Sequence, residues 1–509
     1  VTYMDSFKEK HNVNVMIGSS AQNNVYNYMN ASVKEFLSDN NNQLNNGLLD
    51  PTVGGSRNDW ALLSFFGRAN YSYDNKYLLT ATVRRDGTSR ISKNNRWGTF
   101  PSFSAAWRLS EESFYKRNDL ISDVKIRAGY GVTGNQGVLD NYAYITRLKT
   151  AQYVFNGTPV STLYPLVMAN PDIKWETVKQ ANIGLDLSLF KQRVNLTFDA
   201  YVKNTTNMLV SMVVPITTGY SDIYTPMINA GKVKNTGWEL TISSQNIKGG
   251  AINWNTDFNI SYNKNKVQTL DGGVPIYNGY QVHAEGQPIG SFYGYVTNGL
   301  FQNWDEVNNY AYQKQGADPK NSTAPGDVKF KDLDNNGVIN EKDRTYIGNP
   351  TPEWNFSLNN SFNYKDFDLQ IFLQGVAGND IYNANRTSLE SMSVIQNQTT
   401  KVLDRWTGEG TSNSMPRAIY SDPNENNRNS TRFIEDGSYL RLKNVTLGYT
   451  LPESITRKAS LASVRFYMSG QNLYTLTKYS GFDPEVSGGV DNSNYPITRT
   501  ISFGLDIKF

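Results

Sequence analysis

Apolar and polar residues alternate along this chain with a period of two. In the segment 252–262 the even positions are mainly apolar or aromatic, whereas the odd positions are all Asn, Asp or Ser. The last residues, 501–509, repeat the pattern with apolar side chains at every odd position. Successive side chains point to opposite faces in a β-strand, so this period predicts strands with one apolar and one polar face. We therefore expect an all-β fold.

The same pattern recurs in fourteen places. The predicted strands are 12–22, 60–73, 77–90, 98–110, 123–135, 175–190, 193–207, 231–247, 251–266, 352–366, 367–379, 439–452, 463–477 and 498–509. Helical signals are few, and the clearest lies at 33–37 in the first loop.

Short and long connections separate these strands. Tight turns such as 74–76 and 191–192 contrast with long segments rich in Asn, Gly and Pro. The long segments are 136–174, 208–230, 267–351, 380–438 and 478–497. Short turns at one end, long loops at the other and strands of about ten or more residues are typical of an antiparallel transmembrane β-barrel. An even strand count then requires the apolar segment 290–301 to be loop structure.

The polar face distinguishes two architectures that share this period. It carries mostly Asn, Ser, Thr, Gly and Asp, and charged residues make up only 19% of the chain. Small polar groups suit a water-filled lumen, and a closed barrel of many more than about eight strands must turn its apolar residues outward to lipid. A soluble, carbohydrate-binding β-sandwich, with its apolar faces packed together, is the alternative.

Composition excludes several classes of function. The chain has no Cys, only two His, and 49 basic against 46 acidic residues. Disulfides and thiolate metal sites are therefore absent, and the balanced charge gives no field to hold nucleic acid. No acid/base carboxylate pair suited to a glycoside hydrolase is placed by the pattern. We predict no enzymatic activity, no organic cofactor and no nucleic-acid partner.

One motif predicts a calcium site within the 267–351 loop. Its oxygen ligands follow the spacing one, three, five, seven, nine and twelve, with Gly337 at position six. The candidate ligands are Asp332, Asp334, Asn336, the carbonyl of Val338, Asn340 and Asp343. Three converging carboxylates favour a bound divalent cation with a structural role. The alternative is a turn in a loop rich in Asp, Asn and Gly.

Several blocks resemble one family of membrane transporters. Residues 60–73, 76–90 and 95–107 strongly resemble the SusC/RagA-type TonB-dependent outer-membrane transporters. Further similar blocks are 125–136, 235–239, 326–334 and 504–509. The resemblance extends from about Trp60 to the end of the chain.

The resemblance implies a plugged barrel of about 22 strands. It also implies the outer membrane of a Gram-negative bacterium, a SusD-like surface lipoprotein as lid, and uptake of glycan fragments or peptides driven by TonB through an N-terminal plug. Residues 1–509 contain no plug-like or TonB-contacting segment. We therefore expect them to be the C-terminal part of such a barrel, embedded in outer-membrane lipid, with eight strands elsewhere. A self-closed passive porin is the alternative, and no substrate-binding residue is predicted.

Overall fold

The structure is a computed structural model that describes residues 1–116, 118–212, 217, 226–314 and 322–509. Parts of two predicted long segments, 213–216 with 218–225 and 315–321, lie outside the described residues. β-Strands dominate what is described. The helices in these ranges are all too short or too polar to cross a membrane.

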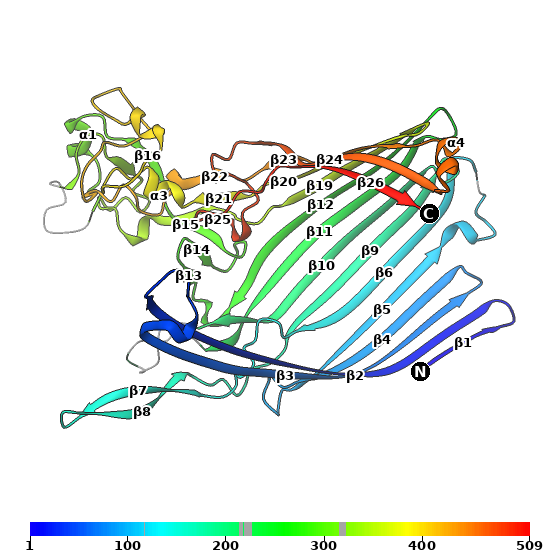
Figure 1. The fold of residues 1–509 in the computed structure, drawn as a ribbon, viewed down its shortest axis with the longest axis horizontal. Coiled ribbons are helices and arrows are strands. Elements are labelled where there is room, and N and C mark those ends of the chain that lie inside the picture. Colours follow the sequence, from blue (N-terminus) through cyan, green and yellow to red (C-terminus); the bar gives the residue numbers. More distant parts are fainter. Residues whose placement is uncertain (117, 213–216, 218–225, 315–321) are drawn as a thin grey trace. The chain divides into compact units, whose positions relative to one another are not determined.

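Fifteen strands form one large sheet (Figure 1). They are β1 (Thr2–Phe7), β2 (His11–Phe36), β3 (Gly47–Tyr73), β4 (Tyr77–Thr88), β5 (Trp97–Arg108), β6 (Ile121–Asn135), β9 (Glu176–Leu189), β10 (Val194–Ser211), β11 (Met227–Ile247), β12 (Ile252–Leu270), β19 (Trp354–Tyr364), β20 (Phe367–Ala377), β23 (Tyr439–Thr450), β24 (Ser463–Thr477) and β26 (Thr500–Lys508). Their order in the sheet is their order in the chain. All fourteen predicted strands are present, and β1 is an additional one.

The chain divides into two compact units. The first comprises Val1–Tyr115, Ile126–Ile183 and Lys203–Lys232. Its longest hairpin is β2–β3, whose pairing runs from His11 opposite Tyr73 to Phe36 opposite Gly47. These strands extend well beyond the predicted 12–22 and 60–73. The predicted helix at 33–37 is wrong, because pairing of Lys34 with Leu49 and of Phe36 with Gly47 keeps this stretch in β2 and outweighs its local preference.

A second hairpin of this unit lies in the predicted 136–174 loop. Strand β7 (Arg147–Phe155) pairs antiparallel with β8 (Thr158–Val167). The connection is Asn156 and Gly157, both with positive φ (49° and 80°). This geometry matches the two-residue type I′ turn, for which Asn-Gly is the preferred sequence.

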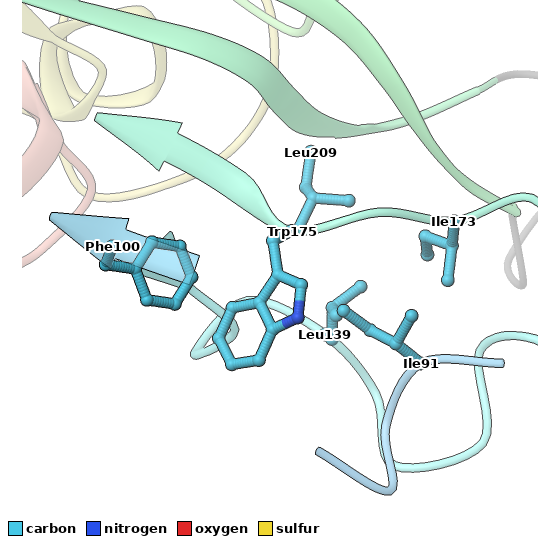
Figure 2. Packing of buried hydrophobic residues seen from close by; sticks show 6 residues of the cluster. All are labelled: Ile91, Phe100, Leu139, Ile173, Trp175 and Leu209. Carbon is cyan, nitrogen blue, oxygen red and sulfur yellow. The ribbon is translucent and has the colours of Figure 1, made fainter. Parts of the chain in front are cut away.

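A small core holds the connections of the first unit together (Figure 2). It contains Ile91, Phe100, Leu139, Ile173, Trp175 and Leu209. Trp175 packs edge-to-face on Phe100, with ring centroids 5.4 Å apart. The indole N–H of Trp175 donates to the carbonyl of Arg96 at 2.9 Å, which satisfies the polar atom of this buried side chain.

The second unit comprises Lys116–Lys125, Gly184–Val202 and Val233–Phe509. Its long connections fold into small sheets. These sheets contain β13 (Ile276–Asn278), β14 (Gln281–His283), β15 (Ser291–Tyr295) and β18 (Arg344–Gly348); β16 (Thr297–Leu300) and β17 (Val328–Phe330); and β22 (Ile434–Asp436), β21 (Asp380–Asn383) and β25 (Val490–Asp491). Short helices α1 (Trp304–Asn309), α3 (Asn385–Leu389) and α4 (Glu453–Thr456) accompany them. Segment 290–301 was predicted to be loop structure; it lies outside the large sheet, as that prediction requires, but it contributes the short strands β15 and β16 to the small sheets.

Candidate functional site

Two rows of side chains cross six adjacent strands of the second unit on opposite faces of the sheet. The register places directly paired residues on the same face. One row is Trp254, Phe362, Leu369, Leu447, Met468 and Phe503. The next row along the strands is Asn255, Ser361, Gln370, Thr446, Ser469 and Ser502. The sheet therefore has one apolar and one polar face, as the period of two predicts.

Half of the apolar row is exposed, in the strands β23, β24 and β26. Leu447, Met468 and Phe503 are 50%, 45% and 79% exposed. In the first unit, Leu79 and Val83 of β4 are each 50% exposed, whereas the alternate residues of that strand are half-buried or buried. A water-soluble sandwich buries such a face against a second sheet. Exposed, contiguous apolar surface on a sheet of this size indicates contact with lipid.

Aromatic clusters lie at two levels of this face. Near the turn after β19, Trp254 stacks on Phe362 with centroids 5.5 Å apart. Eight residues along β12, Tyr262 lies 4.8 Å from Trp354, which also packs against Trp238 at 5.7 Å. Eight residues of strand cover about 26 Å. Because the strands of membrane barrels are tilted by about 35–45°, this spacing amounts to about 20 Å across a bilayer, somewhat less than the apolar band of about 25 Å that separates the two aromatic girdles of such barrels.

Side chains of the polar face are bonded to one another across strands. Thr241 donates to the Asn259 amide oxygen at 2.8 Å, and Ser243 donates to the Asp257 carboxylate at 2.7 Å. Gln370 donates to Asn359 at 3.2 Å. These contacts satisfy polar groups on the same face, as expected for the lining of a wet lumen. They mark no substrate site.

The structure brings the predicted calcium-loop carboxylates together. Oxygens of Asp332, Asp334 and Asp343 lie within 4.8 Å of one another. Asp343 is fully buried, whereas Asp334 is exposed. Gly337 has a φ of +83°, which supplies the sharp turn expected at position six. The spacing therefore predicted this convergence correctly.

Backbone N–H groups hold the loop in this shape. Gly337 donates to Asp332 at 2.8 Å, and Asn336 donates to Asp332 and to Asp334, each at 3.2 Å. Burial acts to raise the pKa of Asp332, but these N–H groups stabilise the charged carboxylate and bring its pKa below the usual value. Asp332 is thus prepared to ligate as an anion.

Three of the remaining predicted ligand groups already take part in hydrogen bonds within the loop. The Val338 carbonyl accepts from the Asn340 side chain at 3.1 Å, and Asp343 accepts from the N–H groups of Leu333 (2.7 Å) and Asn340 (2.8 Å). Asn340 and Asp343 form a capping box at the 3₁₀ turn Glu341–Asp343. Binding of a cation by all six candidates therefore requires exchange of some of these hydrogen bonds.

A buried ion pair fixes the region beneath the loop. Asp327 is fully buried and accepts two hydrogen bonds from the guanidinium of Arg417, at 2.9 and 3.0 Å. Nearby, Ile339 of the calcium-like loop is buried in a cluster with Leu300, Val328 and Phe330. The Asp327–Arg417 ion pair was not predicted from the sequence, although Asp327 lies in one of the blocks that resemble the transporter family.

Comparison with known proteins agrees with this geometry. Residues 3–473 match the family model "TonB dependent receptor-like, beta-barrel". The chain is 36% identical over 533 aligned positions to TonB-dependent receptor P3 of Formosa agariphila, covering 100% of this chain and 52% of that protein. It is 32% identical to TonB-dependent receptor SusC of Bacteroides thetaiotaomicron, covering 91% of this chain and 45% of SusC.

A solved structure shows the same fold. The structure of the RagAB peptide transporter matches with a TM-score of 0.86 and 26% identity, covering 100% of this chain and 54% of the matched one. The chain spans about half the length of the curated relatives it matches.

Proposed function

The chain belongs to the TonB-dependent receptor β-barrel family, and from this premise we propose that it is the C-terminal part of a SusC-like transporter in the outer membrane of a Gram-negative bacterium. The observation that carries the proposal is the apolar row across β12, β19, β20, β23, β24 and β26, exposed in the last three of these strands and opposite a polar row. Such a sheet suits lipid on one side and water on the other.

The proposed transport is uptake of glycan fragments or peptides with a SusD-like lipoprotein as partner. Two likenesses support it: the sequence similarity to SusC, and the fold shared with a structure described as a peptide transporter. The proposed energy source is TonB, acting through a plug domain of the full-length protein. A passive porin is the competing function, and it needs neither TonB nor a lipoprotein.

Uptake by cells separates these two functions. Cells expressing the full-length receptor are supplied with labelled oligosaccharides or peptides, with TonB present or deleted. We expect uptake only when TonB is present, and co-purification of a lipoprotein with the receptor in detergent. Equal uptake in the two strains contradicts energised transport and favours the porin.

The Asp-rich loop is proposed to hold a structural Ca²⁺. Its support is the convergence of three carboxylates within 4.8 Å and the position-six glycine. Asp332, Asp334 and Asp343 would supply carboxylate oxygens, with Asn336, Val338 and Asn340 completing the set. The ion would neutralise their mutual repulsion and brace the excursion 267–351.

Calorimetry of the full-length receptor in detergent tests the calcium proposal. We expect saturable Ca²⁺ binding that Asp334→Asn weakens by about tenfold or more, because one anionic ligand is lost. Asp305→Asn is the matched control, since Asp305 is an exposed acid of the same excursion outside the cluster. Absence of binding, or equal affinity in both variants, contradicts the site.

A further inference from the structure

Three lysines of the second unit lie together on two neighbouring strands of the large sheet. They are Lys234 of β11 and Lys264 and Lys266 of β12 (Figure 1). Lys264 and Lys266 are exposed, and Lys234 is half-buried. Among the residues that the structure describes, none of the three makes an ion pair with a carboxylate. Their positive charges are therefore uncompensated within this part of the chain.

Strand alternation fixes the face on which these lysines lie. On the polar face, Asn263 and Asn265 of β12 both donate to the Asn235 side chain of β11, at 3.2 and 2.9 Å. The lysines occupy the positions next to these asparagines along the two strands. Successive side chains of a strand point to opposite faces, so the three lysines share the apolar face.

The acidic residues of the same two strands lie on the polar face. Asp257 accepts a hydrogen bond from Ser243 at 2.7 Å, and Glu239 lines a hollow of the polar face together with Thr241 and Asn259. They are the acidic residues of β11 and β12. The apolar face of this strand pair therefore carries only basic charge.

The lysines lie just beyond an aromatic level of the apolar face. That level is the cluster in which Trp354 contacts Tyr262 and Trp238, with ring centroids 4.8 and 5.7 Å apart. Lys264 is two residues beyond Tyr262, and Lys234 is four residues from Trp238, both toward the long connections. Two to four residues of strand cover about 7 to 13 Å. Since aromatic girdles lie at the headgroup level, flexible lysine side chains at this distance reach the headgroups.

The register of β11 and β12 brings two of these charges close together. Cross-strand hydrogen bonds of the polar face, such as that from Thr241 to Asn259 at 2.8 Å, follow one antiparallel register. Continued toward the long connections, this register sets Lys234 opposite Lys266. Opposed residues have Cβ atoms about 5 Å apart, and like charges there destabilise a sheet. An anion bound between the two ammonium groups removes this repulsion.

We propose that Lys234, Lys264 and Lys266 bind the phosphate of an anionic lipid headgroup, in the leaflet on the side of the long connections. The ammonium groups donate to phosphate oxygens, and the acyl chains of the lipid lie against the apolar face beyond the aromatic cluster. This inference rests on the proposed placement in the outer membrane and not on uptake driven by TonB. An acidic protein partner is the competing occupant. The position of the lysines on the apolar face, beside the aromatic level, favours the lipid.

Native mass spectrometry of the full-length receptor in a neutral detergent tests the site. The probes are dioleoyl phosphatidic acid, dioleoyl phosphatidylcholine, and inorganic phosphate as a phosphate without acyl chains. We expect phosphatidic acid to bind more tightly than phosphatidylcholine, and inorganic phosphate not to displace it. We expect Lys234→Gln, Lys264→Gln and Lys266→Gln each to weaken the binding of phosphatidic acid by about fivefold, and the triple variant by about a hundredfold.

Two further triple variants are the controls. Replacing the three lysines by Arg keeps their charge and is expected to retain binding. Lys331→Gln/Lys342→Gln/Lys401→Gln removes the same charge from exposed lysines of the long connections and is expected to leave binding unchanged.

Four results overturn the assignment. They are equal binding of the two lipids, equal loss in the two Gln triple variants, displacement of the lipid by inorganic phosphate, and loss of a co-purifying lipoprotein from the Lys234/Lys264/Lys266 variant with lipid binding unchanged. The last result assigns the lysines to a protein partner.

The TonB uptake experiment keeps this site separate from the proposed transport. TonB-dependent uptake together with lipid binding that does not depend on the three lysines leaves transport intact and removes the lipid site. Lysine-dependent lipid binding together with TonB-independent uptake leaves the lipid site intact and removes energised transport.

Discussion

Asp327 shows how a residue's role depends on a distant partner. It lies in the 326–334 block, but Arg417, which donates to it, is 90 residues further along the chain. No spacing rule links the two. The Asp-rich loop is different, because Asp332, Asp334 and Asp343 belong to one local pattern, and their convergence followed from spacing alone.

Glu435 makes its contacts with Ser480, Asn383 and Arg386 sensitive to acid. Burial acts to raise the pKa of Glu435, but hydrogen bonds from Ser480 and Asn383 and the charge of Arg386 bring it below its usual value. A lowered pKa means that the folded protein favours the ionised form, so this stabilisation is complete above the unfolded value of about 4.3 and is lost as the pH falls through the folded value.

Hydrogen exchange at acid pH measures this effect. The Ser480 N–H donates to Glu435 at 2.7 Å. After correction for intrinsic exchange rates, we expect protection of this amide to be constant from pH 7 to 5 and to fall below about pH 4. Glu435→Gln is expected to show lower protection without this acid transition. An identical acid transition in Glu435→Gln contradicts the assignment to this carboxylate.

Strands whose pattern is regular were the elements best predicted from sequence. The large sheet has one apolar and one polar face, and this difference appears directly in the sequence as the period of two. β1 was missed because six residues carry little periodicity. The β7–β8 hairpin was missed although Asn156 and Gly157 are the strongest short hairpin signal. The small loop sheets depend on tertiary contacts that local sequence does not record.

A charged side chain should destabilise the protein much more on the apolar face of two adjacent strands than on their polar face. Leu447 pairs with Leu369 on the apolar face, and Gln370 pairs with Thr446 on the polar face one position along. We expect Leu447→Arg to destabilise the full-length receptor in bilayers by up to about 2 to 4 kcal/mol, because arginine is placed in hydrocarbon. Gln370→Arg is the control and is expected to cost less than about 1 kcal/mol, because its side chain remains in water.

Unfolding in urea after insertion into phospholipid vesicles gives both values. The order of the two variants is the critical result. A larger loss for Gln370→Arg than for Leu447→Arg means that the faces have been assigned the wrong way round.

At the scale of the whole molecule, the sheet has fifteen strands where fourteen were predicted. Family membership was predicted from local blocks of sequence. The match of the family model to residues 3–473 confirms it. Substrate and partners were not fixed by those blocks, since selectivity depends on loop geometry.

Tryptophan fluorescence tests the membrane environment of the whole protein. Trp254 and Trp354 lie in the aromatic clusters of the apolar face. In vesicles of bromine-labelled phospholipid we expect strong quenching of the full-length receptor, because bromine quenches only nearby indoles. Replacing Trp254 and Trp354 by Phe should reduce that quenching. A receptor that is monodisperse in plain buffer and is not quenched contradicts insertion into lipid.

The two rows that cross β20 and β23 mean that alternate residues of one strand are subject to two independent requirements. If the proposed transport function holds, every second residue determines how the protein contacts its bilayer, and the residues between them determine what a transported solute contacts. A library that randomises only Gln370, Thr446 and their neighbours on that face therefore changes the passage while leaving insertion untouched. Under that proposal, residues that contact the solute and residues that contact lipid can accumulate substitutions at different rates within the same strand.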